Sequence, residues 1–311
     1  MRTVKIEKNI QNTSLAAPKQ AFSQVLSETL KTGIIKSNLL AMMAGLSLAL
    51  YITGTSFSEK FLKFSLQFLG LALVIGAAGA FNNLYDRDID AIMDRTKNRP
   101  TVTGRMQPFN ALMLGISLSI VGIILLLLAT PLAALFGFLG LFLYVVPYTM
   151  WSKRRTIYNT EIGSISGAVP PLIGWSAISA EMFHPAVVGL FVVMVIWQMP
   201  HFYAIAIRRH DEYKAASVPM LPVVKGFKRT FVQTNIYLVA LVLASFLFIS
   251  FSWVITLVAF LLALAWLVVS IVGHKRMEPK KWATLMFVFS LNHLVILFTA
   301  IIGYSLLAPL F

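Results

Sequence analysis

The chain has 311 residues, of which 58% are hydrophobic and 12% are charged. A soluble protein of this length carries about 25% charged residues, so the composition predicts an all-α polytopic membrane protein with little soluble mass. Cysteine is absent, which excludes disulfides, thiolate metal sites and cysteine nucleophiles. The net charge of +14 is dispersed over short loops, which argues against a nucleic-acid partner.

Residues 1–36 are polar and mixed in charge, and we expect them to form a cytoplasmic N-terminal tail. They contain no apolar core followed by a small-residue cleavage site, so no secretory signal peptide is expected. Residues 37–311 are expected to form a single transmembrane domain. They contain nine apolar segments close to the roughly 20 residues that cross about 30 Å of hydrocarbon. These segments are 37–57, 64–84, 108–129, 131–150, 161–180, 186–207, 230–250, 253–273 and 283–306.

Two links between the expected spans are very short, and the fifth span has an unusual composition. Thr130–Pro131 separates the third and fourth spans, and Phe251–Ser252 separates the seventh and eighth, so both pairs should form helical hairpins. Gly163–Pro171 in the fifth span is rich in glycine and proline. Such residues let helices pack closely, and the prolines predict a bend.

The basic residues predict the orientation of the chain. Of the 26 Lys and Arg residues, 24 fall in loops on one side of the expected bundle, and only Lys60 and Lys63 lie on the other. Positively charged loops remain in the cytoplasm. We therefore expect the N-terminus inside and the C-terminus outside, with most basic residues serving as topology signals. A mitochondrial transit peptide is not recognised in the N-terminal residues, so we expect a location in the plasma membrane.

Six of the twelve acidic residues lie on the same side as the basic loops. They are Asp86, Asp88, Asp90, Asp94, Asp211 and Glu212. Asn82, Asp86, Asp90 and Asp94 are spaced by four. If the second span continues as a helix, each step of four advances about 400°, which places the four side chains in one oblique stripe.

Carboxylates packed this closely repel one another unless a cation lies among them. Mg²⁺ is typically bound by a few carboxylates together with substrate phosphates. The stripe therefore predicts a Mg²⁺–diphosphate site at a membrane surface. The alternative is a solvated helix end whose acids pair with neighbouring arginines, although ionisable residues beside membrane helices are costly unless they are used.

Asp211 and Glu212 follow the sixth span and predict a second carboxylate patch that faces the first across the bundle. The alternative is a juxtamembrane loop with local ion pairs. Guanidinium and ammonium groups suit phosphate oxygens, and the alternative role for these groups is anchoring at the cytoplasmic face. The candidate phosphate-binding residues are Arg95, Arg99, Lys153, Arg154 and Lys214.

His201 is a polar residue inside the sixth span and directly follows Pro200. A proline in a helix leaves a backbone carbonyl without its usual partner. His201 either binds that freed backbone or lines a cavity for an acceptor substrate.

The run Asn82-x3-Asp86-x3-Asp90-x3-Asp94-Arg95-Thr96-x2-Arg99-Pro100 resembles the first aspartate-rich motif of the UbiA superfamily of intramembrane prenyltransferases. Further stretches resemble its protohaem IX farnesyltransferase (haem O synthase) branch. They are Tyr148-Thr149-x3-Lys153-Arg154, Gly167–Trp175 and Trp197–Ala204, the last continuing to Val223. The similarity covers about residues 35–305. Other branches carry DxxxD in the second motif, whereas Ile207 precedes Asp211 by four here, so the second site departs from the superfamily pattern.

The resemblance implies a UbiA-type bundle of nine helices around a cavity open to the inner face and partly to lipid. Farnesyl diphosphate would bind with its diphosphate on Mg²⁺ and its tail in the membrane. The acceptor would be the 2-vinyl group of haem B, and the products would be haem O and diphosphate. Haem A synthase or terminal-oxidase assembly would be partners on the path from haem O to haem A.

The resemblance and the charge pattern together suggest roles for individual residues. The expected catalytic residues are Asn82, Asp86, Asp90 and Asp211. The expected Mg²⁺ ligands are Asp86, Asp90, Asp94 and Asp211. The five basic candidates named above would bind the diphosphate, and His201 would lie on the haem side.

Three other functions fit parts of the pattern. Another UbiA-type aromatic prenyltransferase, of a quinone or chlorophyll pathway, would share the diphosphate motif. A secondary transporter would also have many helices and internal charges, but near the bilayer midplane, whereas these carboxylates cluster with arginines at one face. A haem chaperone would bind the porphyrin without transferring a prenyl group.

Overall fold

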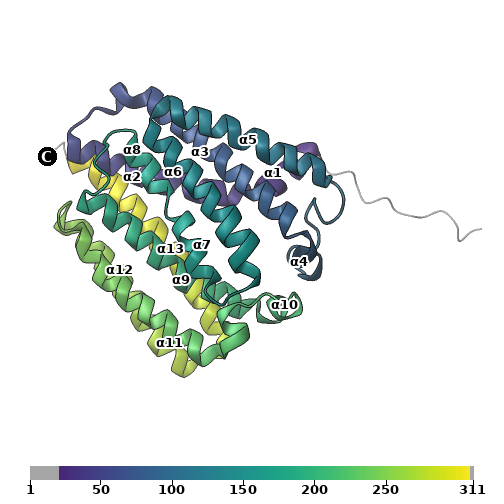
Figure 1. The fold of residues 1–311 in the computed structure, drawn as a ribbon. Helices are drawn as coiled ribbons and strands as arrows, with labels where there is room; N and C mark the ends of the chain where they lie inside the picture. Colours follow the sequence, from purple (N-terminus) through teal and green to yellow (C-terminus); the bar gives the residue numbers. More distant parts are fainter. Residues whose placement is uncertain (1–20, 309–311) are drawn as a thin grey trace, which may run out of the picture.

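The computed structural model describes residues 21–308, and all regular structure in that range is helical. Eight helices are long and apolar enough to cross a membrane, so the protein is a polytopic membrane protein. Figure 1 shows them side by side in one bundle. They are α2 (Thr32–Thr53), α3 (Phe57–Tyr85), α5 (Pro108–Ala129), α6 (Pro131–Leu143, with continuations to Arg154), α9 (Pro185–Arg208), α11 (Leu221–Ala244, continuing to Phe248), α12 (Trp253–Arg276) and α13 (Pro279–Leu307).

The fifth expected span is broken, so residues 21–308 contain eight long membrane helices instead of the nine predicted. It forms α7 (Asn159–Gly167) and α8 (Pro170–Ser176). Two successive prolines start α8, and they cannot donate the backbone hydrogen bonds that would continue α7. Gly174 brings α8 against α2, because a Cβ there would lie 1.9 Å from the carbonyl oxygen of Met42.

Both predicted helical hairpins are present. Thr130 ends α5, and its side chain accepts a hydrogen bond from the backbone N–H of Ala133 at 3.1 Å, which caps α6. Ser252 likewise accepts from the N–H of Val254 at 3.2 Å and caps α12. A hydroxyl that satisfies a free N–H in this way stabilises a helix start by about 1 kcal/mol.

Part of the expected N-terminal tail is structured. Residues 22–30 form α1 (Phe22–Leu30), whose buried side chains are Val25 and Thr29. The side-chain amide of Asn83 on α3 donates to the carbonyl oxygen of Thr29 at 2.9 Å. The basic residues Arg2, Lys5, Lys8 and Lys19 of the tail lie outside the described residues.

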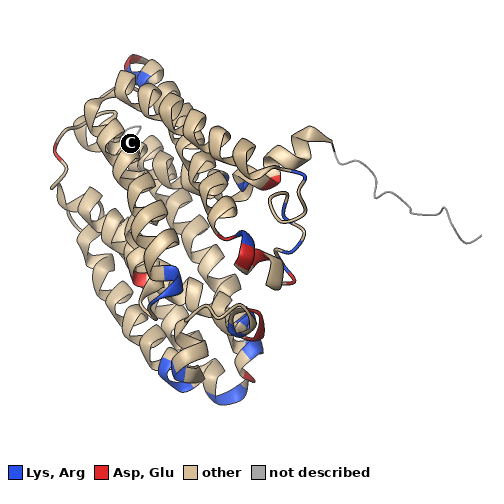
Figure 2. Cartoon of the chain, turned by 45° about the vertical axis from the view of Figure 1, so that its right-hand side comes forward, with Lys and Arg blue, Asp and Glu red and all other residues tan. Residues whose placement is uncertain are grey.

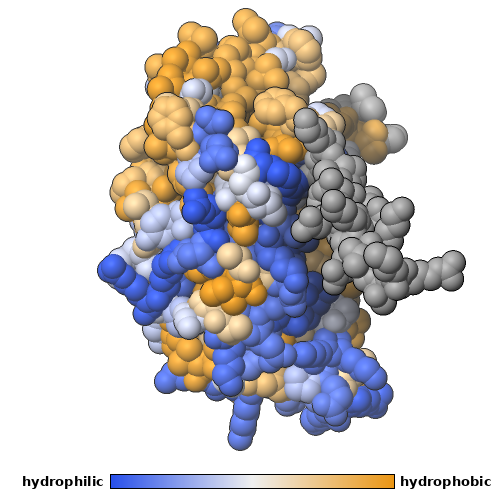
Figure 3. All heavy atoms as spheres, turned by 90° about the vertical axis from the view of Figure 1, so that its right-hand side faces the viewer, coloured by the Kyte–Doolittle hydropathy of each residue, from blue (hydrophilic) through white to orange (hydrophobic). Residues whose placement is uncertain are grey.

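Most charged residues gather at one end of the bundle. Figure 2 shows Lys, Arg, Asp and Glu concentrated around the ends of the long helices and around two short helices, α4 (Arg87–Ile92) and α10 (His210–Ala215). Figure 3 views this end directly, and hydrophilic residues cover the middle and lower part of that face. Large side chains such as Trp175, Trp266 and Phe298 fill the interior between the helices. The fold therefore places both acidic loops at one hydrophilic end.

Candidate functional site

The buried row at the end of α3 contains three of the predicted site residues. α3 ends at Tyr85, and the backbone hydrogen bonds Asp86 N–H to Asn82 O (2.9 Å) and Asp90 N–H to Asp86 O (2.7 Å) continue the helical spacing into α4. Asn82, Asp86 and Asp90 are 4%, 0% and 3% exposed. The predicted stripe therefore exists for these three residues and is enclosed within the protein.

Asp94 lies beyond that row. α4 ends at Ile92, and Met93 has an extended backbone (ψ 124°), so the helical spacing stops before Asp94. The Asp94 carboxylate is 80% exposed and pairs with Lys97 at 2.7 Å. Lys97 also lowers the pKa of Asp94. The end of α4 explains why the fourth member of the stripe lies at the surface.

Asp86 is at the centre of the charged groups. Its Oδ2 atom accepts hydrogen bonds from the ammonium of Lys153 and from the side-chain amide of Asn82 at 2.7 Å. Its Oδ1 atom is buried with no hydrogen-bond partner in the described structure, and the guanidinium of Arg154 lies 3.8 Å from it. Leaving a buried acceptor unsatisfied costs about 1–3 kcal/mol or more, so this oxygen is suited to a bound cation.

Asp90 is held by a second cation. The guanidinium of Arg99 donates to Oδ2 of Asp90 at 2.5 Å. The hydroxyl of Thr96 donates to the Asp90 carbonyl oxygen at 3.1 Å and fixes the turn that returns Arg99 to the row. The loop after α4 therefore folds back so that its arginine faces the buried carboxylates.

The basic pair after the fourth span reaches the same row. Lys153 and Arg154 lie on the short helix η2 (Ser152–Arg154), which follows a π-helical segment, η1 (Tyr144–Trp151). Arg154 donates twice to Asp88, at 2.7 Å each, and lies 4.8 Å from the ring centroid of Tyr85. The Arg154 hydrogen bonds lower the pKa of Asp88 to about 2. Asp88 is thus an anchor for Arg154, a role that its sequence position did not indicate.

Two further residues join the row without having been predicted. The ammonium of Lys31, between α1 and α2, donates to Oδ1 of Asn82. The hydroxyl of Thr149 accepts from the Asn82 amide at 3.3 Å. Burial lowers the pKa of Lys31 well below its usual value, and the charges of Arg99 and Lys153 add to the effect. Lys31 belongs to no motif used above, so only its position before the first span could have drawn attention to it.

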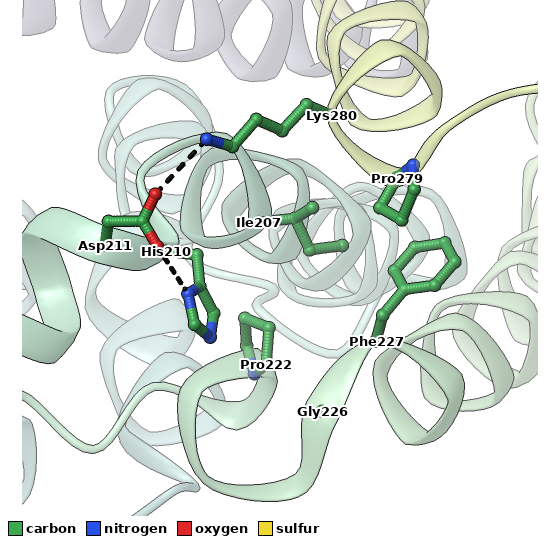
Figure 4. A pocket seen from close by; sticks show the side chains of 8 residues that line it. All are labelled: Ile207, His210, Asp211, Pro222, Gly226, Phe227, Pro279 and Lys280. Carbon is green, nitrogen blue, oxygen red and sulfur yellow. Dashed lines mark hydrogen bonds and ion pairs between the residues drawn. The ribbon is translucent and has the colours of Figure 1, made fainter.

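The second acidic loop has a different environment. Asp211 on α10 is 78% exposed and pairs with Lys280 at 3.2 Å and with His210 at 3.1 Å. These two partners lower its pKa. Figure 4 shows the three side chains at a surface pocket of about 290 Å³. All residues that line this pocket come from α9 to α13.

Glu212, rather than Asp211, connects the second acidic loop to the first. One carboxylate oxygen of Glu212 accepts from Arg209 at 2.8 Å, and the other accepts from the backbone N–H of Arg95 at 3.4 Å. Figures 1 and 2 likewise place α4 and α10 near one another. The side chains of Arg95 and Lys214 are exposed and form no ion pair among residues 21–308.

His201 lies in the middle of an aromatic cluster. Its Nδ1 atom is 2.7 Å from the hydroxyl of Ser290, so its partner is a side chain of α13 instead of the backbone freed by Pro200. Its ring stacks on Trp197 at 4.7 Å and lies 5.2 Å from Phe287. The structure therefore fixes the ring between α9 and α13.

The donor set of the buried row suits Mg²⁺ together with an anion. Among residues 21–308, no three His, Cys, Asp or Glu side chains lie close enough to form a metal site by themselves. Mg²⁺ usually takes one or two carboxylates and completes its coordination with water and substrate phosphates. Asp86, Asp90 and the Asn82 amide match that pattern. Four cationic side chains surround the row, and they can pair with a bound anion in addition to the two carboxylates. They are Lys31, Arg99, Lys153 and Arg154.

Comparison with known proteins agrees with this arrangement. The profile of the UbiA prenyltransferase family matches residues 38–293. A protein of Shouchella clausii named Protoheme IX farnesyltransferase is 77% identical over 311 residues and covers 100% of both chains. Protoheme IX farnesyltransferase 2 of Bacillus subtilis is 47% identical over 277 residues, which is 89% of this chain and 90% of that protein.

Two solved structures share the fold at low sequence identity. A digeranylgeranylglyceryl phosphate synthase aligns with a TM-score of 0.73 at 19% identity and covers 91% of this chain and 98% of its own. A UbiA homologue from Archaeoglobus fulgidus, solved with GPP and Mg²⁺, aligns with a TM-score of 0.62 at 17% identity and covers 90% and 99%. By its sequence profile, its close relatives and its fold, the chain belongs to the UbiA prenyltransferase family.

Proposed function

We propose that the protein transfers the farnesyl group of farnesyl diphosphate to the 2-vinyl group of protohaem IX (haem B), which yields haem O and diphosphate. The observation that carries this proposal is the buried row Asn82–Asp86–Asp90 with its surrounding cations and the partnerless Oδ1 of Asp86. The name Protoheme IX farnesyltransferase, borne by relatives that match the whole chain, supports the choice of acceptor.

Asn82, Asp86 and Asp90 would hold Mg²⁺ with the diphosphate. The bound metal would supply Lewis-acid stabilisation of negative charge on the leaving oxygen. The Archaeoglobus homologue with GPP and Mg²⁺ supports this choice of cofactor for the fold. The metal role of Asp94 stays a prediction from the sequence, because its carboxylate is exposed and bound to Lys97.

Asp211 would reach the diphosphate only after a movement of α10. Its partners in the structure are exposed side chains, Lys280 and His210. Exposed ion pairs contribute little to stability, so they would oppose such a movement weakly. Glu212 already holds this loop beside Arg95. The movement would bring the second acidic loop, with Lys214, over the bound substrate.

The chemistry follows from the charge distribution. The C–O bond of farnesyl diphosphate breaks to give an allylic cation, and the bonding electrons leave with the diphosphate. Arg99, Lys153 and Arg154 stabilise that growing negative charge, with Arg95 available at the loop edge. The vinyl π-bond attacks the cation directly, so no general base is needed for this step. Water then adds to the haem-side cation and loses a proton, which gives the hydroxyethylfarnesyl group.

The position of the site also supports a topology. We propose that α7 and α8 together form a ninth crossing, so that the N-terminus lies inside and the C-terminus outside. The support is the placement of 24 of the 26 Lys and Arg residues in loops on one side. The protein would then be a single domain of the plasma membrane with cytoplasmic active-site loops.

His201 would line the haem side, and haem A synthase or terminal-oxidase assembly would receive haem O.

The test is incubation of membranes that contain the protein with haem B, farnesyl diphosphate and Mg²⁺, followed by mass analysis of the haem. We expect haem O, and we expect none after chelation of divalent cations with EDTA and full recovery on addition of Mg²⁺. Full turnover without divalent cations would reject the metal-assisted mechanism. Farnesylation of an aromatic quinone precursor with no change in haem would favour the other UbiA-type activity.

A further inference from the structure

The corner between α1 and α2 has a conformation that its surroundings must maintain. Lys31 forms this corner with φ 55° and ψ 55°, and it is one of two non-glycine residues with positive φ among residues 21–308. The left-handed conformation costs a residue with a Cβ about 1–2 kcal/mol. Such conformations persist where the surrounding structure fixes them, and they cluster at functional sites.

Contacts with α3 hold the corner in place. The side-chain amide of Asn83 donates to the carbonyl oxygens of Thr29 at 2.9 Å and Glu28 at 3.4 Å, at the end of α1. Gly79 allows a close approach, since a Cβ there would lie 2.9 Å from the carbonyl oxygen of Leu30. Two neighbouring residues of α3 therefore have separate tasks: Asn83 holds α1, and Asn82 is the first member of the buried row.

The charge of Lys31 is poorly compensated where it lies. Its ammonium donates to Oδ1 of Asn82, which is a neutral amide oxygen. Neither nearby carboxylate forms an ion pair with Lys31: Asp86 pairs with Lys153, and Asp90 pairs with Arg99. A buried ammonium is costly unless an opposite charge pairs with it. The partly buried ammonium of Lys31 is therefore placed to pair with an additional anion in the site.

The partner of Lys31 is also an atom that the proposed metal would use. Mg²⁺ bound to Oδ1 of Asn82 would lie beside the ammonium, and the two cations would repel each other. An ammonium on a long side chain can turn to a new acceptor, because it has three donors and a flexible stem. A phosphate oxygen would supply that acceptor and the missing negative charge together.

We propose that Lys31 binds the diphosphate: it leaves Oδ1 of Asn82 when the substrate enters and donates to a phosphate oxygen of the leaving group. This inference deepens the proposed function and rests on it for the identity of the diphosphate ester. It makes the α1–α2 corner a part of the active site and gives α1 the task of positioning a catalytic cation.

The experiment measures binding of Mg²⁺–pyrophosphate to purified protein in detergent by isothermal titration calorimetry. Lys31→Met should weaken binding about 10- to 100-fold, as expected for loss of a hydrogen bond between charged groups. Lys31→Arg should keep part of the affinity. The control is Lys36→Met, which removes an exposed lysine of α2 and should change affinity less than about 2-fold. Wild-type affinity in Lys31→Met would overturn the proposal.

A second variant separates binding from folding. Asn83→Ala removes the amide that holds α1 but keeps the ammonium of Lys31. It should weaken pyrophosphate binding in the wild-type protein, whereas adding it to Lys31→Met should change the affinity little. Equal effects of Asn83→Ala in both backgrounds would reject the positioning role. Pyrophosphate binding does not require the substrate that accepts the farnesyl group. If pyrophosphate affinity depends on Lys31 but the protein makes no haem O, the haem activity is refuted and the role of Lys31 stands.

Discussion

The two acidic loops contain similar residues in similar positions, yet the protein treats them differently. Each loop follows the end of a long helix and includes a short helix, α4 or α10. Asp86 and Asp90 of the first loop are buried against three cations, whereas Asp211 of the second is exposed beside Lys280. Burial of carboxylates is costly without strong partners, and the ion pairs of the first loop offset the cost of burying Asp86 and Asp90.

The difference arises from what covers each loop. The first loop is enclosed by η2 and by the α1–α2 corner, which contribute Lys153 and Lys31. The second loop lies at the rim, where His210 and Lys280 share a pocket with apolar residues such as Phe227. The contrast agrees with the proposed function, in which the first loop is the fixed part of the site and α10 moves over the bound substrate. The predictions below test whether the fixed part carries most of the activity.

Asp86→Asn should have the largest effect. The substitution keeps the shape of the side chain but removes the charge that pairs with Lys153 and that would bind Mg²⁺. We expect farnesyl transfer to haem B to fall by about 10³-fold or more, since loss of a single electrostatic contact to a transition state costs about 10²–10³. The measurement is haem O formation at saturating Mg²⁺, with size-exclusion chromatography as the control for folding. Activity within 10-fold of the wild type would remove Asp86 from the site.

Asp211→Asn should have an intermediate effect. If α10 closes over the substrate, loss of this carboxylate should lower the rate about 10-fold and raise the Mg²⁺ concentration needed for half-maximal activity. Lys280→Met, which frees Asp211 from its surface partner, should leave the Mg²⁺ requirement unchanged or lower it. An unchanged rate and Mg²⁺ dependence in Asp211→Asn would show that the second loop acts through Glu212 alone.

Local sequence patterns predicted much of the architecture. The expected span 108–129 matches α5 residue for residue, and both short links form the predicted hairpins. The spacing of Asn82, Asp86 and Asp90 predicted a row that the structure buries. These features depend on helical periodicity and on local turn chemistry, which neighbouring residues determine.

Contacts between distant segments could not be predicted in this way. Lys31 and Asn82 are 51 positions apart, and Arg95 and Glu212 are 117 apart. The π-helical η1, which directs Lys153 and Arg154 toward α4, has no periodic signature of its own. That Glu212 is the residue of the second loop that contacts Arg95 was not predicted for the same reason, because tertiary packing selects between adjacent residues. The metal role of Asp211 stays a prediction.

Asp94→Asn should have the smallest effect. The spacing of four suggested that Asp94 joins Asp86 and Asp90, but α4 ends at Ile92 and turns this carboxylate outward to Lys97. Solvent screens an exposed pair of this kind, so we expect the rate of haem O formation and its Mg²⁺ dependence to change less than about 2-fold. A loss comparable to that of Asp86→Asn would mean that residues after α4 refold around the substrate and bring Asp94 into the row. That outcome would make the first loop mobile as well and remove the contrast between the two loops.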